Sequence, residues 1–353
     1  MPFLSAWLEQ RLPVRALRDF LAHKQVPARQ HAIWYYFGGA ALFLYLVQVA
    51  TGVLLLLYYR PAPESAFESV RFIVAHVPFG WLIRSVHAWA ANLMVATVFG
   101  HLFSVFFLKA YRSPRELTWM SGCLLLALTM AFGFSGYLLP WNELAFFATK
   151  VGTDIVGAAP LVGDTIRFVL RGGEDVTGAT LTRFFGFHVA LLPLVTTLLL
   201  LGHLLLVQVH GVSEPIGGAT RGRRIPFYPH FMLRELIVWL GMLAVLVGLA
   251  TFLPWELGHK ADPFAPAPQG IRPEWYFTFM SQTLKYLPPT ILGFEGEHVG
   301  ILEFGVIAVL LFVAPLLDRR AGRGVPSPLV SAAGAVLLVF MLAMTLLAYV
   351  KPY

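Results

Sequence analysis

Cysteine and charged residues are both scarce in this chain of 353 residues. The single cysteine, Cys123, excludes an intrachain disulfide, and it equally excludes an iron–sulfur cluster or a multi-thiolate zinc site built from this chain alone. Charged residues make up 13% of the chain and apolar residues 58%, whereas soluble domains are roughly one quarter charged. Any metal chemistry must therefore depend on histidine, and lipid is expected to surround most of the chain.

The basic residues form no continuous face, although the net charge is +7. They are scattered near the ends of apolar runs, without the basic stripe and interleaved aromatic residues typical of nucleic-acid binding, so we expect no nucleic-acid partner. No cleavable signal peptide is evident, because the first apolar run follows residues 1–32 and is too long for a signal sequence. Residues 1–32 mix leucines with arginines, which predicts an amphipathic segment lying flat on the membrane surface.

Long apolar runs predict an all-α integral membrane protein. About 20 apolar residues are needed to cross the hydrocarbon core as a helix, and about seven segments satisfy this requirement. Residues 33–210 are expected to form a four-helix bundle, 211–229 a linker, and 230–353 a three-helix C-terminal half. The predicted spanning helices are 34–58, 81–108, 117–139, 184–207, 233–252, 300–317 and 329–349.

The connecting segments predict the orientation of the chain in the membrane. More than half of the 26 Lys and Arg residues lie in four segments that share one side under this topology, namely 1–32, 109–117, 208–234 and 319–323. Short loops rich in Lys and Arg face the cytoplasm. We therefore expect a multi-pass protein of a bacterial cytoplasmic (inner) membrane with a cytoplasmic amino terminus.

Four histidines lie within two of the predicted spanning helices. His87 and His101 are fourteen residues apart in the second helix, and His188 and His203 are fifteen apart in the fourth. At about 100° and 1.5 Å per residue, each pair falls on roughly one helix face, with about 21 to 23 Å between its members. These two helices run in the same direction, so His87 is expected to be level with His188 and His101 level with His203.

Such a quartet predicts two iron sites. An ionisable residue inside a spanning helix is costly and is functional by default, whereas a single histidine could be a hydrogen-bonded core residue. Imidazole is a ready iron ligand, and a bundle core is where such cofactors are held. Two axial histidines leave iron no open position, so each centre is expected to relay electrons instead of binding oxygen.

Glycines with the same spacing occur on two other predicted helices. Gly38 and Gly52 are fourteen residues apart, and so are Gly122 and Gly136. A planar macrocycle between helices needs close backbone approach, which glycine permits. Ordinary packing of small residues between membrane helices is the alternative explanation. The match to the histidine spacing favours haem.

Two arginines precede one histidine of each pair. Arg84 lies three residues before His87, and Arg183 lies five residues before His188. Guanidinium groups bind carboxylates in a bidentate manner, so both arginines are candidates for pairing with haem propionates. An arginine that extends to the membrane interface explains them equally well.

Four segments resemble one family of proteins. They are Arg84-Ser-Val-His87, Gly136-Tyr-Leu-Leu-Pro-Trp141, Leu181-Thr-Arg-Phe-Phe-Gly-Phe-His188 and Pro273-Glu-Trp-Tyr-Phe277. In order with the histidine quartet, they resemble cytochrome b of the quinol:cytochrome c and quinol:plastocyanin oxidoreductases over nearly the whole chain.

Two features are similar to the plastid-type form of that family, which is split into two polypeptides: the spacing of fifteen residues between His188 and His203, and the segment Pro114-Arg-Glu-Leu-Thr-Trp119. In this chain the two halves look fused. In the split form a cysteine tethers an extra haem. Tyr36 stands at the matching position, and Cys123 has no attachment motif around it, so both expected haems are non-covalent b-type haems.

The resemblance implies the catalytic core subunit of a quinol:cytochrome c oxidoreductase. Quinol would be oxidised at the outer face, with one electron passing to a Rieske iron–sulfur protein and onward to a c-type cytochrome. The other electron would pass through the two haems to an inner quinone site, contributing to proton translocation. The resemblance also implies a homodimer within the complex.

The resemblance assigns proton-handling residues to both quinone sites. Glu274 matches the residue that accepts a quinol proton, with Tyr276 and Tyr137 nearby, and a mostly apolar pocket raises the pKa of such a carboxyl. At the inner site, Arg234 and Glu235 follow residues 225–229, and Glu235 is the candidate proton donor. Interfacial charges at a helix start are the alternative.

Gln208 and His210 are weaker candidates for the inner site, because a polar helix end explains them adequately.

Two other protein classes fit part of the sequence pattern. A cytochrome b anchor of a membrane hydrogenase or dehydrogenase would hold two haems but has no need for residues 273–277 or for two glycine pairs. A transporter with histidine proton relays is the other alternative, and haem absorbance would eliminate it.

Overall fold

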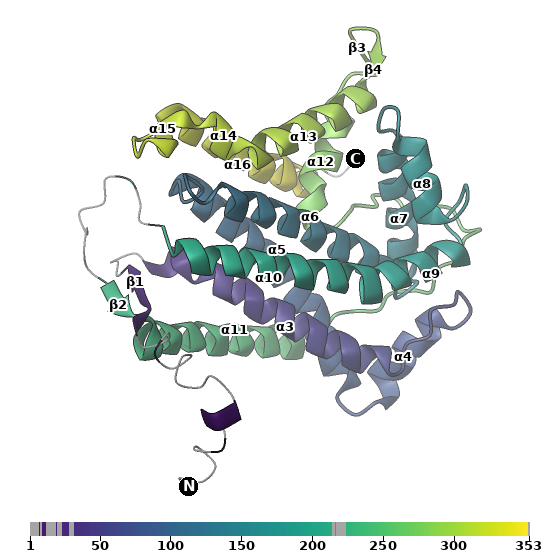
Figure 1. The fold of residues 1–353 in the computed structure, drawn as a ribbon. Helices are drawn as coiled ribbons and strands as arrows, with labels where there is room; N and C mark the ends of the chain where they lie inside the picture. Colours follow the sequence, from purple (N-terminus) through teal and green to yellow (C-terminus); the bar gives the residue numbers. More distant parts are fainter. Residues whose placement is uncertain are drawn as a thin grey trace.

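The computed structural model of this chain is a bundle of long helices. It describes residues 7, 9–11, 19, 23–27, 32–213, 216 and 224–351. The long helices run across Figure 1, with β1, β2 and α15 toward one end of the bundle and α4, α7 and α8 toward the other. We call these ends the α15 side and the α7 side. Most of the predicted surface segment 1–32 and part of the predicted linker 211–229 lie outside the described residues.

The helices from the amino terminus to the linker are α3 (Phe37–Leu56), α4 (Ala66–His76), α5 (Gly80–Phe107), α6 (Glu116–Leu138), α7 (Glu143–Gly157), α8 (Gly163–Arg171), α9 (Gly178–Gly186) and α10 (Leu192–His210). The later helices are α11 (Met232–Phe252), α12 (Trp275–Tyr286), α13 (Gly296–Phe312), α14 (Ala314–Leu317), α15 (Arg319–Gly322) and α16 (Pro328–Val350). Two short antiparallel ribbons pair β1 (Gln25–Pro27) with β2 (Arg224–Pro226) and β3 (Thr290–Ile291) with β4 (Phe294–Glu295).

The described residues contain six helices that are long and apolar enough to cross a membrane. They are 37–56, 80–107, 116–138, 178–210, 227–252 and 328–350. The predicted crossing at 300–317 is interrupted, because α13 ends at Phe312 and Pro315 lies in the first turn of α14. Apolar side chains are exposed along these helices, for example Leu198 and Leu205 of α10. The predicted all-α membrane fold is confirmed.

The fourth spanning helix changes its winding around His188. A π turn at Phe187–Leu191 separates α9 from α10, with the amide of Leu192 donating to the carbonyl of Phe187. Pro193 follows and has no N–H for the usual α-helical bond, so the wider turn leaves no amide unsatisfied there. A π turn accommodates one additional residue. This accounts for the step of fifteen residues to His203 where the other pair has fourteen.

Helix α5 occupies the middle of the bundle. It packs against α3, α6 and α11, and α10 packs against α6. Leu44, Ala90, Met94 and Leu246 form a buried cluster where α3, α5 and α11 meet. Helix α12 packs against α13 and α16, and α16 also contacts α5. The domain boundaries proposed from the sequence stay predictions, and α11 lies against the N-terminal helices α3 and α5.

A buried polar cluster joins the two parts of the chain on the α15 side. The hydroxyl of Tyr111 donates to the carboxylate of Asp318 at 2.7 Å, and Ser327 donates to it at 2.6 Å. The amide of Ala321 donates to the same carboxylate, and the Lys109 ammonium lies 3.9 Å away. The turn after α5 is therefore fastened to the turn between α14 and α15.

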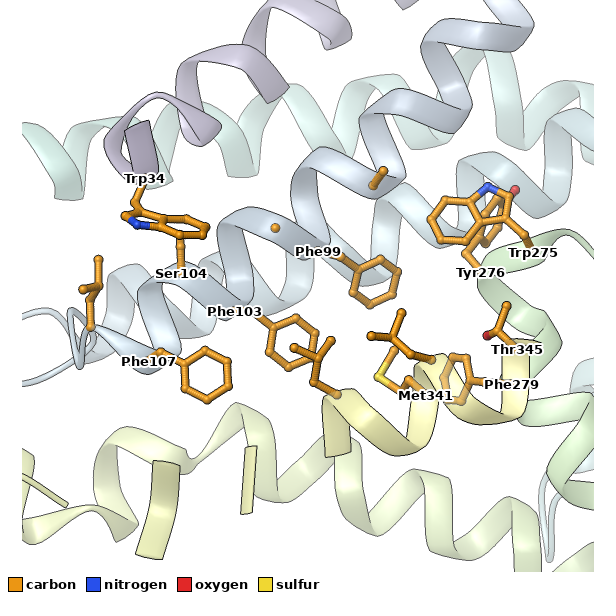
Figure 2. A pocket seen from close by; sticks show the side chains of 15 residues that line it. Trp34, Phe99, Phe103, Ser104, Phe107, Trp275, Tyr276, Phe279, Met341 and Thr345 are labelled. Atoms are coloured by element: carbon orange, nitrogen blue, oxygen red, sulfur yellow. The ribbon is translucent and has the colours of Figure 1, made fainter. Parts of the chain in front are cut away.

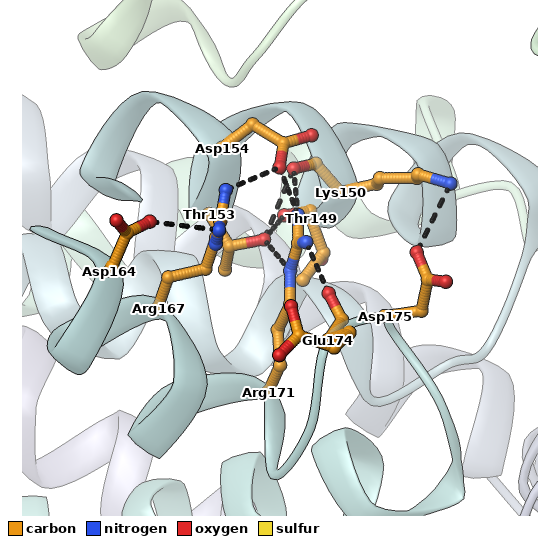
Figure 3. A network of polar contacts seen from close by, with 9 residues as sticks. All are labelled: Thr149, Lys150, Thr153, Asp154, Asp164, Arg167, Arg171, Glu174 and Asp175. Carbon is orange, nitrogen blue, oxygen red and sulfur yellow. Dashed lines mark hydrogen bonds and ion pairs between the residues drawn. The ribbon is translucent and has the colours of Figure 1, made fainter. Parts of the chain in front are cut away.

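A second polar network fastens α8 to α7 on the opposite side (Figure 3). The buried guanidinium of Arg171 donates to Thr153 and to Asp154 at 2.7 Å each, and to the backbone carbonyls of Lys150 and Glu174. Because one side chain satisfies four acceptors from two segments, the pair of helices is held in a fixed arrangement beside the long helices.

Candidate functional site

His87 of α5 and His188 of the π turn face each other toward the α7 side. Their ring centroids are 6.4 Å apart and their planes are inclined by 71°. Nδ1 of His87 lies 2.8 Å from the hydroxyl of Thr51, and Nδ1 of His188 lies 3.1 Å from the hydroxyl of Ser135. When Nδ1–H donates to these hydroxyls, each Nε2 keeps its lone pair for a metal.

His101 and His203 form a second pair toward the α15 side. The two rings are close enough to interact electrostatically. Nδ1 of His203 lies 2.9 Å from the hydroxyl of Ser121. Nδ1 of His101 is buried and has no hydrogen-bond partner in the described part of the chain. The structure thus brings the four histidines together as two facing pairs.

Each histidine ring lies against a glycine of a neighbouring helix. The contacts are Gly52 with His87, Gly136 with His188, Gly38 with His101, and Gly122 with His203. A Cβ atom at Gly136 would lie 2.5 Å from Cε1 of His188, and at the other three glycines the corresponding distance is 3.2 to 3.4 Å. Side chains at these positions would crowd the rings.

The two pairs fit an iron porphyrin held by two axial imidazoles. A metal–imidazole bond is about 2 Å long. Two such bonds, together with the distance from nitrogen to ring centroid in each imidazole, would place the two centroids a little over 6 Å apart. The centroids of His87 and His188 are 6.4 Å apart, in agreement with this value. Among the described residues, no group of three or more His, Cys, Asp or Glu side chains can hold a metal ion. Two protein ligands suit a metal whose other ligands come from a macrocycle.

Sequence reasoning missed the hydroxyl partners of the histidines. Thr51, Ser121 and Ser135 each directly precede one of the four glycines. A hydroxyl residue directly before three of the four glycines is the signal that could have found them. Phe37 precedes the fourth glycine, Gly38, which accounts for the missing partner of His101.

The two candidate arginines bind backbone carbonyls. Arg84 is buried, and its guanidinium donates to the carbonyls of Trp255 and Glu256 in the segment after α11. Arg183 is exposed and donates to the carbonyl of Val169 at the end of α8. Arg84 therefore fastens the segment after α11 to α5, and Arg183 fastens the end of α8 to α9.

Glu274, Tyr276 and Tyr137 lie together at the start of α12. Glu274 is the residue that precedes the helix, and it is close enough to both tyrosines to interact electrostatically. Burial raises the pKa of the Glu274 carboxyl above its usual value. Tyr276 is buried with its hydroxyl against Gly133 of α6. The structure brings the three predicted residues into one site.

Helix α12 begins deep in the bundle. The indole N–H of Trp275 donates to the side-chain oxygen of Asn92 at 2.8 Å, and Asn92 lies near the middle of α5. Phe277 packs edge-on against Phe134 of α6. The segment that carries Glu274 therefore dips toward the membrane interior before α12 returns to the α7 side.

Glu235 and Arg234 lie at the start of α11, on the α15 side. The Glu235 carboxylate is buried and so close to Gly39 that a side chain at Gly39 would overlap with it. Arg234 is exposed. Nearby, the ring of Tyr36 stacks on Phe231 at 5.3 Å. The carboxylate thus faces the first turn of α3, next to the glycine that contacts His101.

The weaker candidates at the end of α10 contact neighbouring segments. The side-chain oxygen of Gln208 accepts a hydrogen bond from Lys24. The backbone carbonyl of His210 accepts one from Arg115 at 2.8 Å. The contact of Gln208 fits the explanation of a polar helix end, whereas Nδ1 of His210 is buried and has no hydrogen-bond partner among the described residues.

Comparison with known proteins agrees with this geometry. A family model described as cytochrome b/b6/petB matches residues 22–211, and one described as cytochrome b(C-terminal)/b6/petD matches residues 260–352. A cytochrome bc complex cytochrome b subunit of Chlorobaculum thiosulfatiphilum is 47% identical over 99% of this chain and 81% of its own length. Cytochrome b6 of Heliobacterium mobile is 44% identical over 60% of this chain and 99% of its own length.

A solved structure described as a hyperthermophilic respiratory Complex III contains a chain with the same fold. It superimposes with a TM-score of 0.82 at 30% identity, and the match covers 97% of each chain.

Membrane-spanning helices that carry facing histidine pairs define a class of membrane electron-transfer proteins. This chain belongs to the cytochrome b/b6 family, with the N-terminal and C-terminal family regions in one polypeptide. It is a multi-pass redox subunit that carries two b-type haems and transfers electrons across the membrane in quinol oxidation. The predicted family and activity are confirmed, and the hydrogenase-anchor alternative is not favoured.

Proposed function

We propose that this chain binds one haem between His87 and His188 and the other between His101 and His203. The observation that carries the assignment is the 6.4 Å separation of the His87 and His188 rings, with a glycine against each ring. When bound, haem iron supplies one-electron transfer. His87 and His188 would hold the iron by Nε2, because Thr51 and Ser135 engage Nδ1 of the two rings.

On the α7 side, Glu274 accepts a proton from a quinol hydroxyl while Tyr276 and Tyr137 line the same site. Support comes from the shared location of the three side chains and from the raised pKa of Glu274, which makes its carboxylate a stronger base near neutral pH. Arg84, which contacts the segment after α11, and Arg183, which contacts the end of α8, are candidates for pairing with haem propionates.

On the α15 side, Glu235 donates a proton to quinone and the exposed Arg234 contributes positive charge at the entrance. Support comes from the burial of the Glu235 carboxylate against Gly39, beside the glycine that contacts His101. Proton uptake on this side and proton release on the α7 side would together move charge across the membrane.

The chain works within a cytochrome bc-type complex, with a Rieske iron–sulfur protein and a c-type cytochrome as electron partners. We further propose a homodimer in a bacterial cytoplasmic membrane, with the amino terminus and the α15 side facing the cytoplasm. The concentration of Lys and Arg in segments 109–117, 208–234 and 319–323 supports this orientation.

The substitution His203→Leu tests the haem assignment. It should remove one b-type centre and leave the other, because only His101 would remain to hold the haem of that pair. The measurement is a redox titration of haem absorbance on the purified complex. His210→Leu, on the same helix, is the matched control and should retain both centres. Two unchanged centres in the His203 variant would refute the pairing.

A further inference from the structure

An apolar groove of about 630 Å³ runs along α5, between that helix and α16. Its volume lies within the range of ordinary ligand pockets. Aromatic rings form about half of its wall, and three of them, Phe99, Phe103 and Phe107, follow one another along α5 (Figure 2). The rings that define the groove are Trp34, Phe99, Phe103, Phe107, Trp275, Tyr276 and Phe279.

The packing of α16 against α5 leaves this space open. At Gly334 the α16 backbone touches the ring of Phe106, and no larger residue would fit there. Farther along, Leu338 and Met341 of α16 and Ala96 of α5 face the groove without filling it, and Ala96 remains exposed. The groove is therefore built into the crossing of the two helices.

Three of the polar groups at the wall are directed away from the groove. The indole N–H of Trp275 is donated to Asn92, and the hydroxyl of Ser104 is donated to the carbonyl of His101. The Tyr276 hydroxyl lies against Gly133 of α6. Apart from Thr345, the wall consists mainly of aromatic rings and apolar side chains, so the groove suits a hydrocarbon chain and not a polar head group.

The length of the groove matches one leaflet of a bilayer. It extends along α5 from Ala96 to Leu108, which is about 18 Å at 1.5 Å per residue. Half of a hydrocarbon core about 30 Å thick is about 15 Å. Trp275 closes the groove near the middle of α5, and the interfacial side chain of Trp34 lies toward its α15 end.

The groove opens toward the lipid phase, since Phe107 and Leu342 on its rim are exposed in spanning helices. We infer that it binds one acyl chain of a phospholipid from the leaflet on the α15 side. A quinone tail is the alternative occupant, because Tyr276 belongs both to the groove and to the site of Glu274, and the measurement below distinguishes the two.

The bound chain supports the segment that carries Glu274. It fills the space behind Trp275 and Tyr276, whose rings would otherwise lose contact atoms on one side. The lipid therefore belongs to the fixed structure of this region, and it is expected to remain through purification in detergent while bulk lipid is removed.

The substitution Ala96→Phe fills the groove and tests the inference. The purified complex is washed in detergent until its phospholipid content is constant, and phospholipid per haem is measured by native mass spectrometry and phosphorus analysis. Wild-type protein should retain a lipid that the Ala96 variant lacks, a loss of one per chain. Val339→Phe adds the same ring on an exposed position of α16 outside the groove and should retain the lipid.

Equal phospholipid content in the Ala96 and Val339 variants would overturn the inference, as would a wild-type complex that keeps no phospholipid. Loss of a quinone in place of a phospholipid would also overturn it, in favour of a quinone tail. Haem content is checked first, and Leu342→Trp serves as the groove-filling variant if Ala96→Phe lowers it. Because the measurement counts lipid and not turnover, its outcome does not depend on the roles proposed for Glu274 or Glu235.

Discussion

Hydrogen bonds at Nδ1 distinguish the four histidines at the scale of single residues. The hydroxyls of Thr51, Ser121 and Ser135 lie within hydrogen-bond distance of Nδ1 in three of the rings, and His101 has no such partner among the described residues. A hydrogen bond at the outer nitrogen makes an imidazole a stronger electron donor to its metal. The site on the α7 side, with two such bonds, should therefore have a lower reduction potential than the site that contains His101, which favours electron flow toward the α15 side.

The substitution Ser135→Ala should raise the reduction potential of the centre held by His188. Loss of one hydrogen bond of about 1 kcal/mol corresponds to tens of millivolts, on the order of 40 mV for one electron. A potentiometric titration of both centres measures the shift. Ser104→Ala is the control, because that hydroxyl donates to the carbonyl of His101 and not to an imidazole. Equal potentials in the Ser135 variant and wild type would contradict the prediction.

The substitution Glu274→Gln should slow quinol oxidation by about 100-fold to 10,000-fold, because it removes the proton-accepting group while preserving its size. Burial raises the pKa of this carboxyl above its usual value of 4.5. The basic form is lost below the raised pKa, so wild-type turnover should increase as pH rises through it. This dependence should vanish in the variant.

Steady-state quinol oxidation across pH measures this effect, with haem content verified beforehand. Glu256→Gln, at an exposed carboxylate of the same connecting segment, is the matched control. A Glu274 variant with the turnover and pH profile of wild type would show that this carboxylate takes no part in proton transfer.

At the scale of secondary structure, the π turn at Phe187–Leu191 determines which face of the fourth spanning helix carries His203. Fifteen residues of regular α-helix would rotate His203 by about 100° relative to the fourteen-residue step. The π turn accommodates the additional residue, so both histidines remain on the face that meets α5 and α6. Pro193 stabilises this winding because it has no amide hydrogen to donate to the α-helical acceptor.

Deletion of Ala190, within the π turn, should therefore retain both haems. The shortened helix can wind as a regular α-helix with a histidine step of fourteen residues, the step that α5 already uses. Deletion of Val98, between His87 and His101, is the matched comparison and should remove the centre that contains His101, because α5 has no wide turn to absorb the change. Haem spectra of both purified variants measure the outcome, and equal haem loss in the two variants would contradict the explanation.

At the scale of the whole molecule, the cluster around Asp318 holds α15 against the turn after α5. Burial alone would raise the pKa of the Asp318 carboxyl, but hydrogen bonds from Ser327, Tyr111 and Ala321 and the nearby charge of Lys109 hold that pKa below its usual value of 3.8. The ionised carboxylate therefore stabilises the fold above about pH 4, and this contribution is lost as pH falls through the lower folded-state pKa.

The substitution Asp318→Asn should lower the free energy of unfolding by about 3 to 5 kcal/mol, because it leaves the buried Lys109 without its counter-charge. Thermal unfolding at neutral pH measures the loss. Asp164→Asn removes an exposed partner of Arg167 and should cost less than about 1 kcal/mol. Between pH 5 and 8 the contribution of Asp318 should be constant. An Asp318 variant as stable as the Asp164 variant would contradict the role of the cluster.

The amino-acid sequence by itself determined the membrane class, most of the spanning helices and the spacing of the four histidines. Hydrocarbon thickness fixes the length of an apolar helix, and the cost of a buried imidazole limits the explanations for His87, His101, His188 and His203. Both arguments need only local sequence and the solvent. The family resemblance added the grouping of Glu274 with two tyrosines.

Only the tertiary structure decided which partners these residues meet. The hydroxyl of Tyr111 reaches Asp318 across 207 positions of sequence, and Trp275 reaches Asn92 across 183. The π turn, the hydroxyl partners of the imidazoles and the groove between α5 and α16 likewise follow from how helices cross and where their hydrogen bonds shift. The local hydrophobic periodicity of the sequence does not predict these features, because helix crossings depend on side chains that pack between segments distant in sequence.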